Sequence, residues 1–133
     1  MSTRSKANVK PRVFISFDYD HDKFLKEALV EQGRRESSTF QIADWSVKRA
    51  SSTWRKDARG RIRRCDLVIA ICGYHTDTAA GVAEEITIAR EEGKPVRLLA
   101  GHKTSVRKPG GCLFKKVYAW NHPNLATMTS GPL

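Results

Sequence analysis

Acidic and aromatic side chains follow the first apolar segment of this chain, in an arrangement that could form a catalytic site. The run Val13–Phe17 is apolar and continues into Asp18, Tyr19 and Asp20, so that rings and carboxylates alternate. A further carboxylate, Glu85, lies beside the apolar stripe of a segment with helical periodicity. In α/β domains, ligands bind at the carboxyl ends of the strands, where a neighbouring helix can supply one more acid. The pattern therefore predicts an enzyme-like site.

Helical periodicity places Glu85 and its neighbour Glu84 on different faces of the predicted helix. At 100° per residue, five apolar residues of this segment share one face. They are Ala79, Val82, Ala83, Ile86 and Ala89. Glu84 points away from this stripe, whereas Glu85 lies on its flank and is expected to be partly shielded from water. Glu85 is therefore either a surface residue with its stem packed down or a functional acid at the edge of the sheet.

Other candidate ligand-binding residues occur where predicted strands end. Phe17 and Asp18 leave the first strand, Asp44 and Trp45 leave the second, and His75 follows the third. Each has a structural alternative. Trp45 could stack on a ligand ring or pack in the core, and Asp18 could form a turn or a helix cap. His75 could bind a ligand or make a hydrogen bond within its loop.

The elements that must position these residues alternate between strand and helix. The predicted strands are Val13–Phe17, Thr39–Trp45, Leu67–Cys72, Val96–Ala100 and Lys116–Trp120. The predicted helices run from a cap at Asp20 or Asp22 to Gly33, from a cap at Ser52 or Thr53 to Arg64, and from a cap at Thr78 to about Glu92. This alternation predicts an α/β domain of the flavodoxin-like, three-layer kind, with a central parallel sheet of about five strands. Residues 12–125 are expected to form this domain, after a disordered basic lead-in (1–11) and before a flexible tail (126–133).

Composition narrows the class of protein. The 133 residues suit one core, and no apolar run approaches the length of a membrane helix. The three cysteines form no metal or disulfide pattern, which indicates buried thiols in a reduced, cytosolic protein. The net charge of +10 is concentrated in residues 48–64, where eight basic residues accompany one acid. Such a cluster could bind nucleic acid, acidic lipid or a phosphorylated small molecule, or simply be a solvated helix face.

Several familiar sites are absent from the sequence. It has no glycine-rich dinucleotide loop after the first strand, no lysine-containing phosphate loop, no Gly-x-Ser-x-Gly turn and no histidine pair with metal-ligand spacing. We therefore expect neither a metal site nor a bound cofactor. The third predicted strand ends in Ile71, Cys72 and Gly73 without an aspartate, which excludes a phosphoacceptor receiver domain.

The ordered set of segments resembles a TIR domain, and most closely the TIR-like subunits of the bacterial Thoeris antiphage system. The likeness covers about residues 12–120. The matching segments are Val13–Asp20, Ile42–Ser46, Arg64–Ile71, His75–Thr76, Glu85–Ile86 and Ala89–Pro95. Many animal and plant TIR enzymes have Trp-Cys where this chain has Gly81-Val82, so the aromatic wall of the pocket must come from elsewhere.

The resemblance implies an activity and a catalytic residue. Enzymatic TIR domains cleave the nicotinamide–ribose bond of NAD, and Thoeris subunits make a cyclised ADP-ribose signal. The position that matches the family's catalytic glutamate is Glu85. NAD would be the substrate, and a separate effector protein would detect the diffusible nucleotide product. A single carboxylate suits this chemistry, because nicotinamide leaves as a neutral molecule and needs no general acid.

Two other functions compete with this interpretation. A non-catalytic TIR module would assemble with other TIR domains and would not depend on Glu85. A nucleic-acid-binding domain would use the basic residues 48–64, but aromatic residues do not interleave with them as in a base-stacking groove. We therefore expect no membrane contact, no nucleic acid and possible TIR self-association.

Overall fold

The computed structural model describes residues 10–130 and contains a five-stranded, all-parallel sheet with the order β2-β1-β3-β4-β5. The strands are β1 (Arg12–Ser16), β2 (Gln41–Trp45), β3 (Leu67–Cys72), β4 (Val96–Ala100) and β5 (Val117–Tyr118). The helices are α2 (Lys23–Gly33), α3 (Trp54–Arg63), the 3-10 turn η1 (Thr76–Thr78), α4 (Ala80–Glu91) and α5 (His122–Ser130). The predicted α/β class with a parallel sheet is confirmed.

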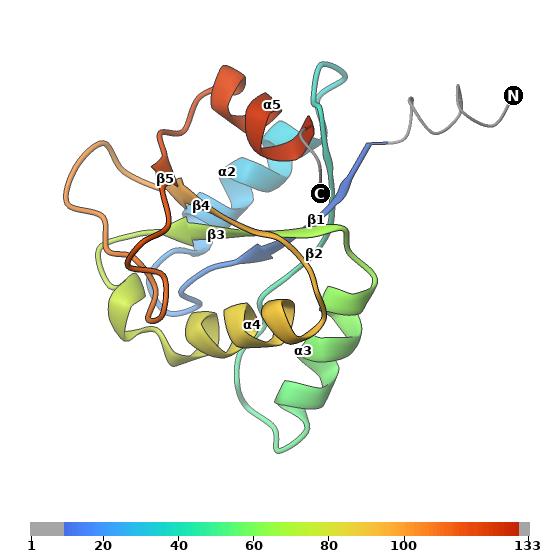
Figure 1. Ribbon diagram of the computed structural model, residues 1–133, viewed down its shortest axis with the longest axis vertical. Helices are drawn as coiled ribbons and strands as arrows, with labels where there is room; N and C mark the ends of the chain where they lie inside the picture. The colour runs from blue at the N-terminus through green and yellow to red at the C-terminus, as the bar shows by residue number, and fades with distance from the viewer. Residues whose placement is uncertain (1–9, 131–133) are drawn as a thin grey trace, which may run out of the picture.

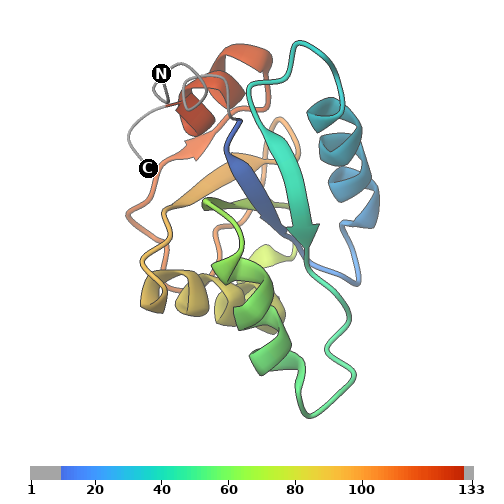
Figure 2. The same cartoon turned by 90° about the vertical axis from the view of Figure 1, so that its right-hand side faces the viewer.

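The molecule has three layers. Helices α3 and α4 cover one face of the sheet, while α2 and α5 cover the other, as Figures 1 and 2 show from two directions. Every residue of β3 is buried, because this strand is central and is covered on both faces. Its side chains alternate between two cores. Val68 and Ala70 pack toward α3 and α4, and Ile69 and Ile71 pack toward α2 and α5.

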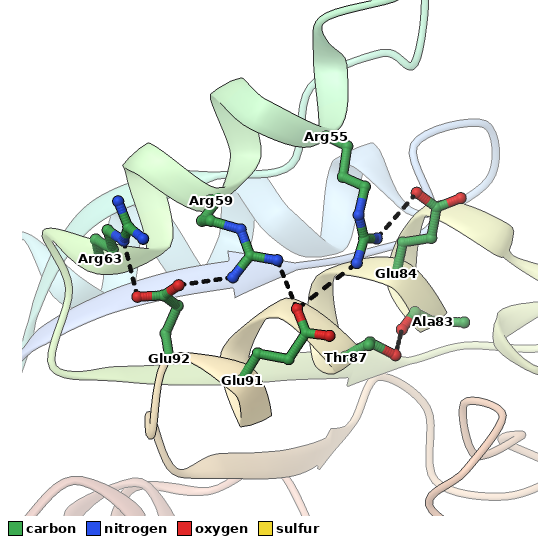
Figure 3. A network of polar contacts seen from close by, with 8 residues as sticks. All are labelled: Arg55, Arg59, Arg63, Ala83, Glu84, Thr87, Glu91 and Glu92. Atoms are coloured by element: carbon green, nitrogen blue, oxygen red, sulfur yellow. Dashed lines mark hydrogen bonds and ion pairs between the residues drawn. The ribbon is translucent and has the colours of Figure 1, made fainter.

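Charged residues hold α3 and α4 side by side. Arg55, Arg59 and Arg63 recur at every fourth position of α3 and therefore share one face of that helix. They form ion pairs with acids of α4 and its C-cap, namely Glu84, Glu91 and Glu92 (Figure 3). The two arginines beside Glu92 lower the pKa of this carboxyl to about 2. These ion pairs join α3 to α4, the helix that carries Glu85.

The C-terminal end corrects the prediction of a flexible tail over residues 126–133 for its first part, residues 126–130, whereas residues 131–133 lie outside the described residues. Helix α5 continues through Ser130, and Met128 and Thr129 are buried. The sequence signal was weak, because the helix is short and contains only a few apolar residues. Pro123, which suits the first turn of a helix, and Leu125 were the available indications. The predicted disordered lead-in falls mainly on residues 1–9, which lie outside the described residues.

The other boundaries agree closely with prediction, with one correction at the start of α4. The ranges predicted for β3 and β4 match the observed ones. Thr78 does not cap α4, because it belongs to η1 and Ala79 occupies the N-cap position without a side-chain hydrogen bond. Asp22 occupies the N-cap position of α2, and its side chain likewise makes no capping hydrogen bond.

The three cysteine thiols are free and buried. Burial raises the pKa of Cys65 to about 11 and that of Cys72 to about 12, so both are protonated at neutral pH. Within residues 10–130, no helix combines the length and the apolar character needed to cross a membrane.

Candidate active site

A cavity of about 370 Å³ opens at the carboxyl end of β1 and extends to the start of α4. Three segments that are distant in sequence line it: residues 17–21 after β1, residues 46–49 after β2, and residues 78–82 before and within α4. Trp54 and Glu85 complete the lining. Strand β1 lies between β2 and β3, and the connection after β1 through α2 covers one face of the sheet while the connection after β3 through α4 covers the other. Parallel α/β sheets bind ligands at such a point.

Glu85 is the buried acid of this cavity, with only 1% of its surface exposed. Its Oε1 accepts hydrogen bonds from the hydroxyls of Ser16 and Ser46, each at 2.6 Å. Among residues 10–130, none donates a hydrogen bond to its Oε2. The side chain is therefore fixed through one oxygen, and the other is available to a group that enters the cavity.

Burial has a strong effect on the protonation of Glu85. Removal of the carboxylate from water raises its pKa to about 7, while the two serine hydrogen bonds and the charge of Arg61 oppose this rise. The acid is therefore close to half ionised at neutral pH. A carboxyl group with such a displaced pKa in a cavity is typical of a functional site.

The period of a β-strand explains why two serines meet Glu85. Ser16 is the last residue of β1, and Ser46 comes directly after β2, which pairs with β1 in parallel register. Because side chains alternate across a strand, Ser16 faces α4 while Ile15 faces the opposite core. Sequence reasoning did not assign these serines to the site. The available signal was a polar residue at the end of an apolar strand.

Glu85 is more deeply buried than the predicted flank position implied. The buried residues of α4 are Val82, Glu85, Ile86, Ile88 and Ala89. The buried face is wider than the predicted stripe, because α4 contacts both the sheet and α3.

Phe17 and Asp18 line the cavity, as expected from their place after β1. Asp18 is buried and also forms the turn that was its structural alternative. Its Oδ1 accepts the backbone N–H of Asp20 at 3.1 Å, and its Oδ2 lies 2.7 Å from Nδ1 of His21. This contact raises the pKa of the half-exposed His21. Both roles of Asp18 are compatible, because a carboxylate has several acceptor positions.

The other three predicted residues do not line the cavity. Trp45 packs against the core beneath α2, with Nζ of Lys26 4.7 Å from its ring centre. Asp44 lies 3.8 Å from Arg61 in an ion pair. His75 stacks on His21 with ring centres 4.2 Å apart, so it adjoins a lining residue without being one. The strand alternation that directs Ser46 toward Glu85 directs Trp45 to the other face of the sheet.

The tryptophan that lines the cavity is Trp54, which was not among the predicted site residues. Its ring is 5% exposed, belongs to the core and lines the cavity. Its Nε1 donates to the carbonyl of Val47 at 3.2 Å. A Cβ placed on Gly81 would lie 4.0 Å from this ring and 3.2 Å from Cδ of Arg49. The side chain of Arg49 therefore packs closely over Gly81, and Trp54 lies beside it at ordinary contact distance.

Most of the basic residues between positions 48 and 64 are already paired with acids. Arg49, Arg55, Arg59, Arg61 and Arg63 form ion pairs with Glu84, Glu91, Glu92 or Asp44. Two of the basic residues, Lys48 and Arg49, line the cavity. No group of three or more histidine, cysteine or acidic residues in the described part of the chain is arranged to hold a metal ion.

Comparisons with known proteins agree with this architecture. The structure of Clostridium botulinum CMP N-glycosidase, BcmB, is similar with a TM-score of 0.50 and 20% sequence identity, over 88% of this chain and 97% of that one. At this identity the likeness concerns the fold. A search of curated proteins found no match. The family model described as "Thoeris protein ThsB, TIR-like domain" matches residues 14–105, which include most of β1, all of β2 to β4 and the whole lining of the cavity. The chain therefore belongs to the Thoeris ThsB TIR-like family.

Proposed function

We propose that this protein cleaves the nicotinamide–ribose bond of NAD and produces a cyclic ADP-ribose-type signal that a separate effector protein detects. One observation carries the proposal. Glu85 is buried at the base of an open cavity, is held through Oε1 by two serine hydroxyls, and has Oε2 free of hydrogen bonds from the described residues. A fixed carboxylate with one available oxygen is what a reaction through a sugar cation requires.

The chemistry follows from the leaving group. The bond between C1′ of the ribose and the ring nitrogen breaks, and nicotinamide leaves as a neutral molecule with the electron pair of that bond. No proton has to be supplied, so one carboxylate is sufficient, whereas ordinary glycosidases use two. Ionised Glu85 stabilises the positive charge that develops on the ribose, and its Oε2 accepts a hydrogen bond from a ribose hydroxyl. Water then captures the cation and releases a proton to the solvent, which gives a linear product, or an atom of the same nucleotide captures it and any proton on that atom passes to the solvent, which gives a cyclic product.

The protonation of Glu85 is compatible with this role. With a pKa of about 7, a substantial fraction of the molecules carries the ionised form at neutral pH. A cationic nicotinamide ring in the cavity favours that form further, because an opposite charge nearby stabilises a carboxylate. The name of the similar structure, a CMP N-glycosidase, adds support. Cleavage of NAD at nicotinamide is likewise scission of a bond between a sugar and a nitrogen base.

The experiment uses purified protein, NAD and lysate from phage-infected cells, because an infection signal is expected to activate the enzyme. Nucleotide products are identified by mass spectrometry. The wild-type protein is expected to release nicotinamide and to form a cyclic ADP-ribose isomer. Glu85→Gln is expected to form neither product, while Glu31→Gln, which changes an exposed glutamate of α2, keeps full activity.

Three results would contradict the proposal. Cleavage of CMP and not of NAD would retain the glycosidase class and reject the substrate. Equal cleavage of NAD by Glu85→Gln and the wild type would remove Glu85 from its assigned role. No cleavage of either nucleotide by wild-type protein would favour the non-catalytic TIR module.

A further inference from the structure

We propose that Lys48, Arg49 and the first backbone amides of α4 bind the 5′-phosphate of the substrate, so that the site accepts nucleotides and rejects nucleosides. This inference rests on the proposed function and specifies how the substrate is recognised. Its basis is the distribution of charge around the cavity that contains Glu85.

The first element of this phosphate site is the amino end of α4, a helix of twelve residues. The N-cap residue Ala79 offers no side-chain acceptor, and the first helical hydrogen bond runs from the N–H of Ala83 to the carbonyl of Ala79. The N–H groups of Ala80, Gly81 and Val82 precede this bond and have no partner within the helix. All three residues line the cavity. Unpaired amides and the helix dipole together attract anions.

The second element is the pair of cations after β2. Lys48 and Arg49 line the same cavity, and Arg49 lies directly over Gly81. The Arg49 guanidinium is held by Glu84 at 2.7 Å and lies 5.3 Å from the ring centre of Trp54. Because a guanidinium has five N–H donors, the contact with Glu84 leaves donors for an incoming phosphate.

The third element is the free oxygen of Glu85, which indicates where the sugar lies. Glu85 is almost fully buried, and its Oε2 receives no hydrogen bond from residues 10–130. It follows Ala80 by five positions, which is about 7.5 Å along a helix axis. A ligand that reaches both places needs a hydroxyl group at one end and an anion at the other. Ribose 5-phosphate has this form.

The charges of the two loops that line the cavity indicate the direction of binding. Asp18 and Asp20 line the cavity after β1, whereas Lys48 and Arg49 line it after β2. A phosphate next to these carboxylates would be repelled, whereas a cationic base would be attracted. The cavity therefore orients a nucleotide with its phosphate toward the loop after β2 and its base toward the loop after β1.

The test measures binding of ribose 5-phosphate by amide NMR, which does not depend on turnover. Ribose 5-phosphate is expected to shift the amide signals of Gly81 and Val82, while ribose at the same concentration does not. In the double variant Lys48→Gln/Arg49→Gln, the dissociation constant is expected to rise at least tenfold. The control Lys56→Gln removes one exposed charge of α3 outside the cavity and is expected to leave the constant unchanged. An unchanged constant in the double variant, an equal rise in the control, or shifts confined to other amides would overturn the proposal.

The turnover of NAD and of nicotinamide riboside distinguishes a failure of this inference from a failure of the proposed function. If ribose 5-phosphate binds as expected and NAD is not cleaved in infected-cell lysate, the phosphate site stands and the proposed NAD chemistry fails. If NAD and nicotinamide riboside are cleaved with equal kcat/KM and ribose 5-phosphate does not bind, the chemistry stands and the phosphate site fails.

Discussion

The hydroxyl of Ser46 lies 2.6 Å from Oε1 of Glu85, although 39 positions separate the two residues in the sequence. The same hydroxyl accepts the backbone N–H of Phe17 at 3.1 Å. Ser46 therefore connects the loop after β1, the end of β2 and the catalytic candidate on α4. This contact gives Glu85 a defined orientation before any ligand enters.

Glu85→Gln is expected to stabilise the protein at alkaline pH while it removes activity. Burial raises the pKa of Glu85 from 4.5 to about 7. The folded state therefore holds this proton more tightly than the unfolded state, and the resulting stability is complete below pH 4.5 and lost as the pH rises to about 7. Glutamine carries no charge and therefore avoids this loss of stability. At 1.36 kcal/mol per pKa unit, the loss in the free energy of unfolding is roughly 3 kcal/mol. Thermal unfolding at pH 5 and pH 8 should show a larger gain in Tm for the variant at pH 8. An equal change in Tm at pH 5 and pH 8, or a decrease at both, would contradict the conclusion that burial destabilises the ionised form of Glu85.

The pH dependence of catalysis should follow the same group. Because the proposed mechanism requires the ionised carboxylate to stabilise the sugar cation, kcat/KM for NAD is expected to rise with pH and to level off above about 7. The measurement is the initial rate of nicotinamide release between pH 5 and pH 9 in the presence of the infection signal. A rate that falls as the pH increases through this range would assign Glu85 the role of a proton donor.

Ser16→Ala is expected to move this pH profile to higher values. The Ser16 hydroxyl donates to Oε1 of Glu85 and lowers the pKa of that carboxyl, so its removal raises the pKa. The activity lost at pH 7 should be recovered in part at pH 9. Ser37→Ala changes an exposed serine and serves as the control. A uniform loss of activity at all pH values would indicate that Ser16 affects substrate geometry and not protonation.

The two tryptophans Trp45 and Trp54 should differ in a paired comparison. Trp45 packs beneath α2 outside the cavity and is only partly buried, so Trp45→Ala is expected to lower stability by about 2 kcal/mol, less than the loss of a fully buried tryptophan, and to leave kcat/KM of the folded fraction unchanged. Trp54→Phe retains a ring at the cavity wall and should raise KM while it lowers Tm only slightly. Urea unfolding and steady-state kinetics measure both effects. A specific loss of activity in Trp45→Ala would return that residue to the site.

The ion pairs between α3 and α4 should make the protein less stable at acidic pH. Arg63 and Arg59 lower the pKa of Glu92 from 4.5 to about 2, so this carboxyl contributes stability that is present above pH 4.5 and is lost as the pH falls through about 2. Glu92→Gln is therefore expected to lower Tm at pH 7 and to have little effect at pH 2. High salt should reduce the difference at pH 7, because these side chains are partly exposed and screened. An equal loss of Tm at both pH values would assign Glu92 a packing role.

The sequence predicted the layers better than the inward-facing side chains of the site. Strands β3 and β4 are continuous apolar runs with sharp ends, so their bounds could be read from composition alone. Helix α5 lacks such a pattern, and its buried residues Leu125 and Met128 belong to an apolar cluster that other elements of the fold complete. The place of Glu85 beside the apolar stripe of α4 was predicted from helical periodicity. Its two serine partners are distant in sequence, at the end of β1 and directly after β2, and they meet Glu85 only in the folded chain. Trp45 was predicted to line the site but lies outside the cavity. Its place at the carboxyl end of a strand could be predicted from the sequence, whereas the face of the sheet on which its side chain lies depends on the exact register.

Lys48 and Arg49 line the cavity from a single exposed loop, whereas Glu85 and its two serine partners belong to, or directly follow, elements anchored in the core. Trp54, at the start of α3, follows that loop and lines the same cavity. Under the proposed function, the groups that would recognise the substrate and the group that would act on its bond therefore belong to separate parts of the chain. A change at positions 48 and 49 would then alter the preferred nucleotide and leave the contacts of Glu85 in place.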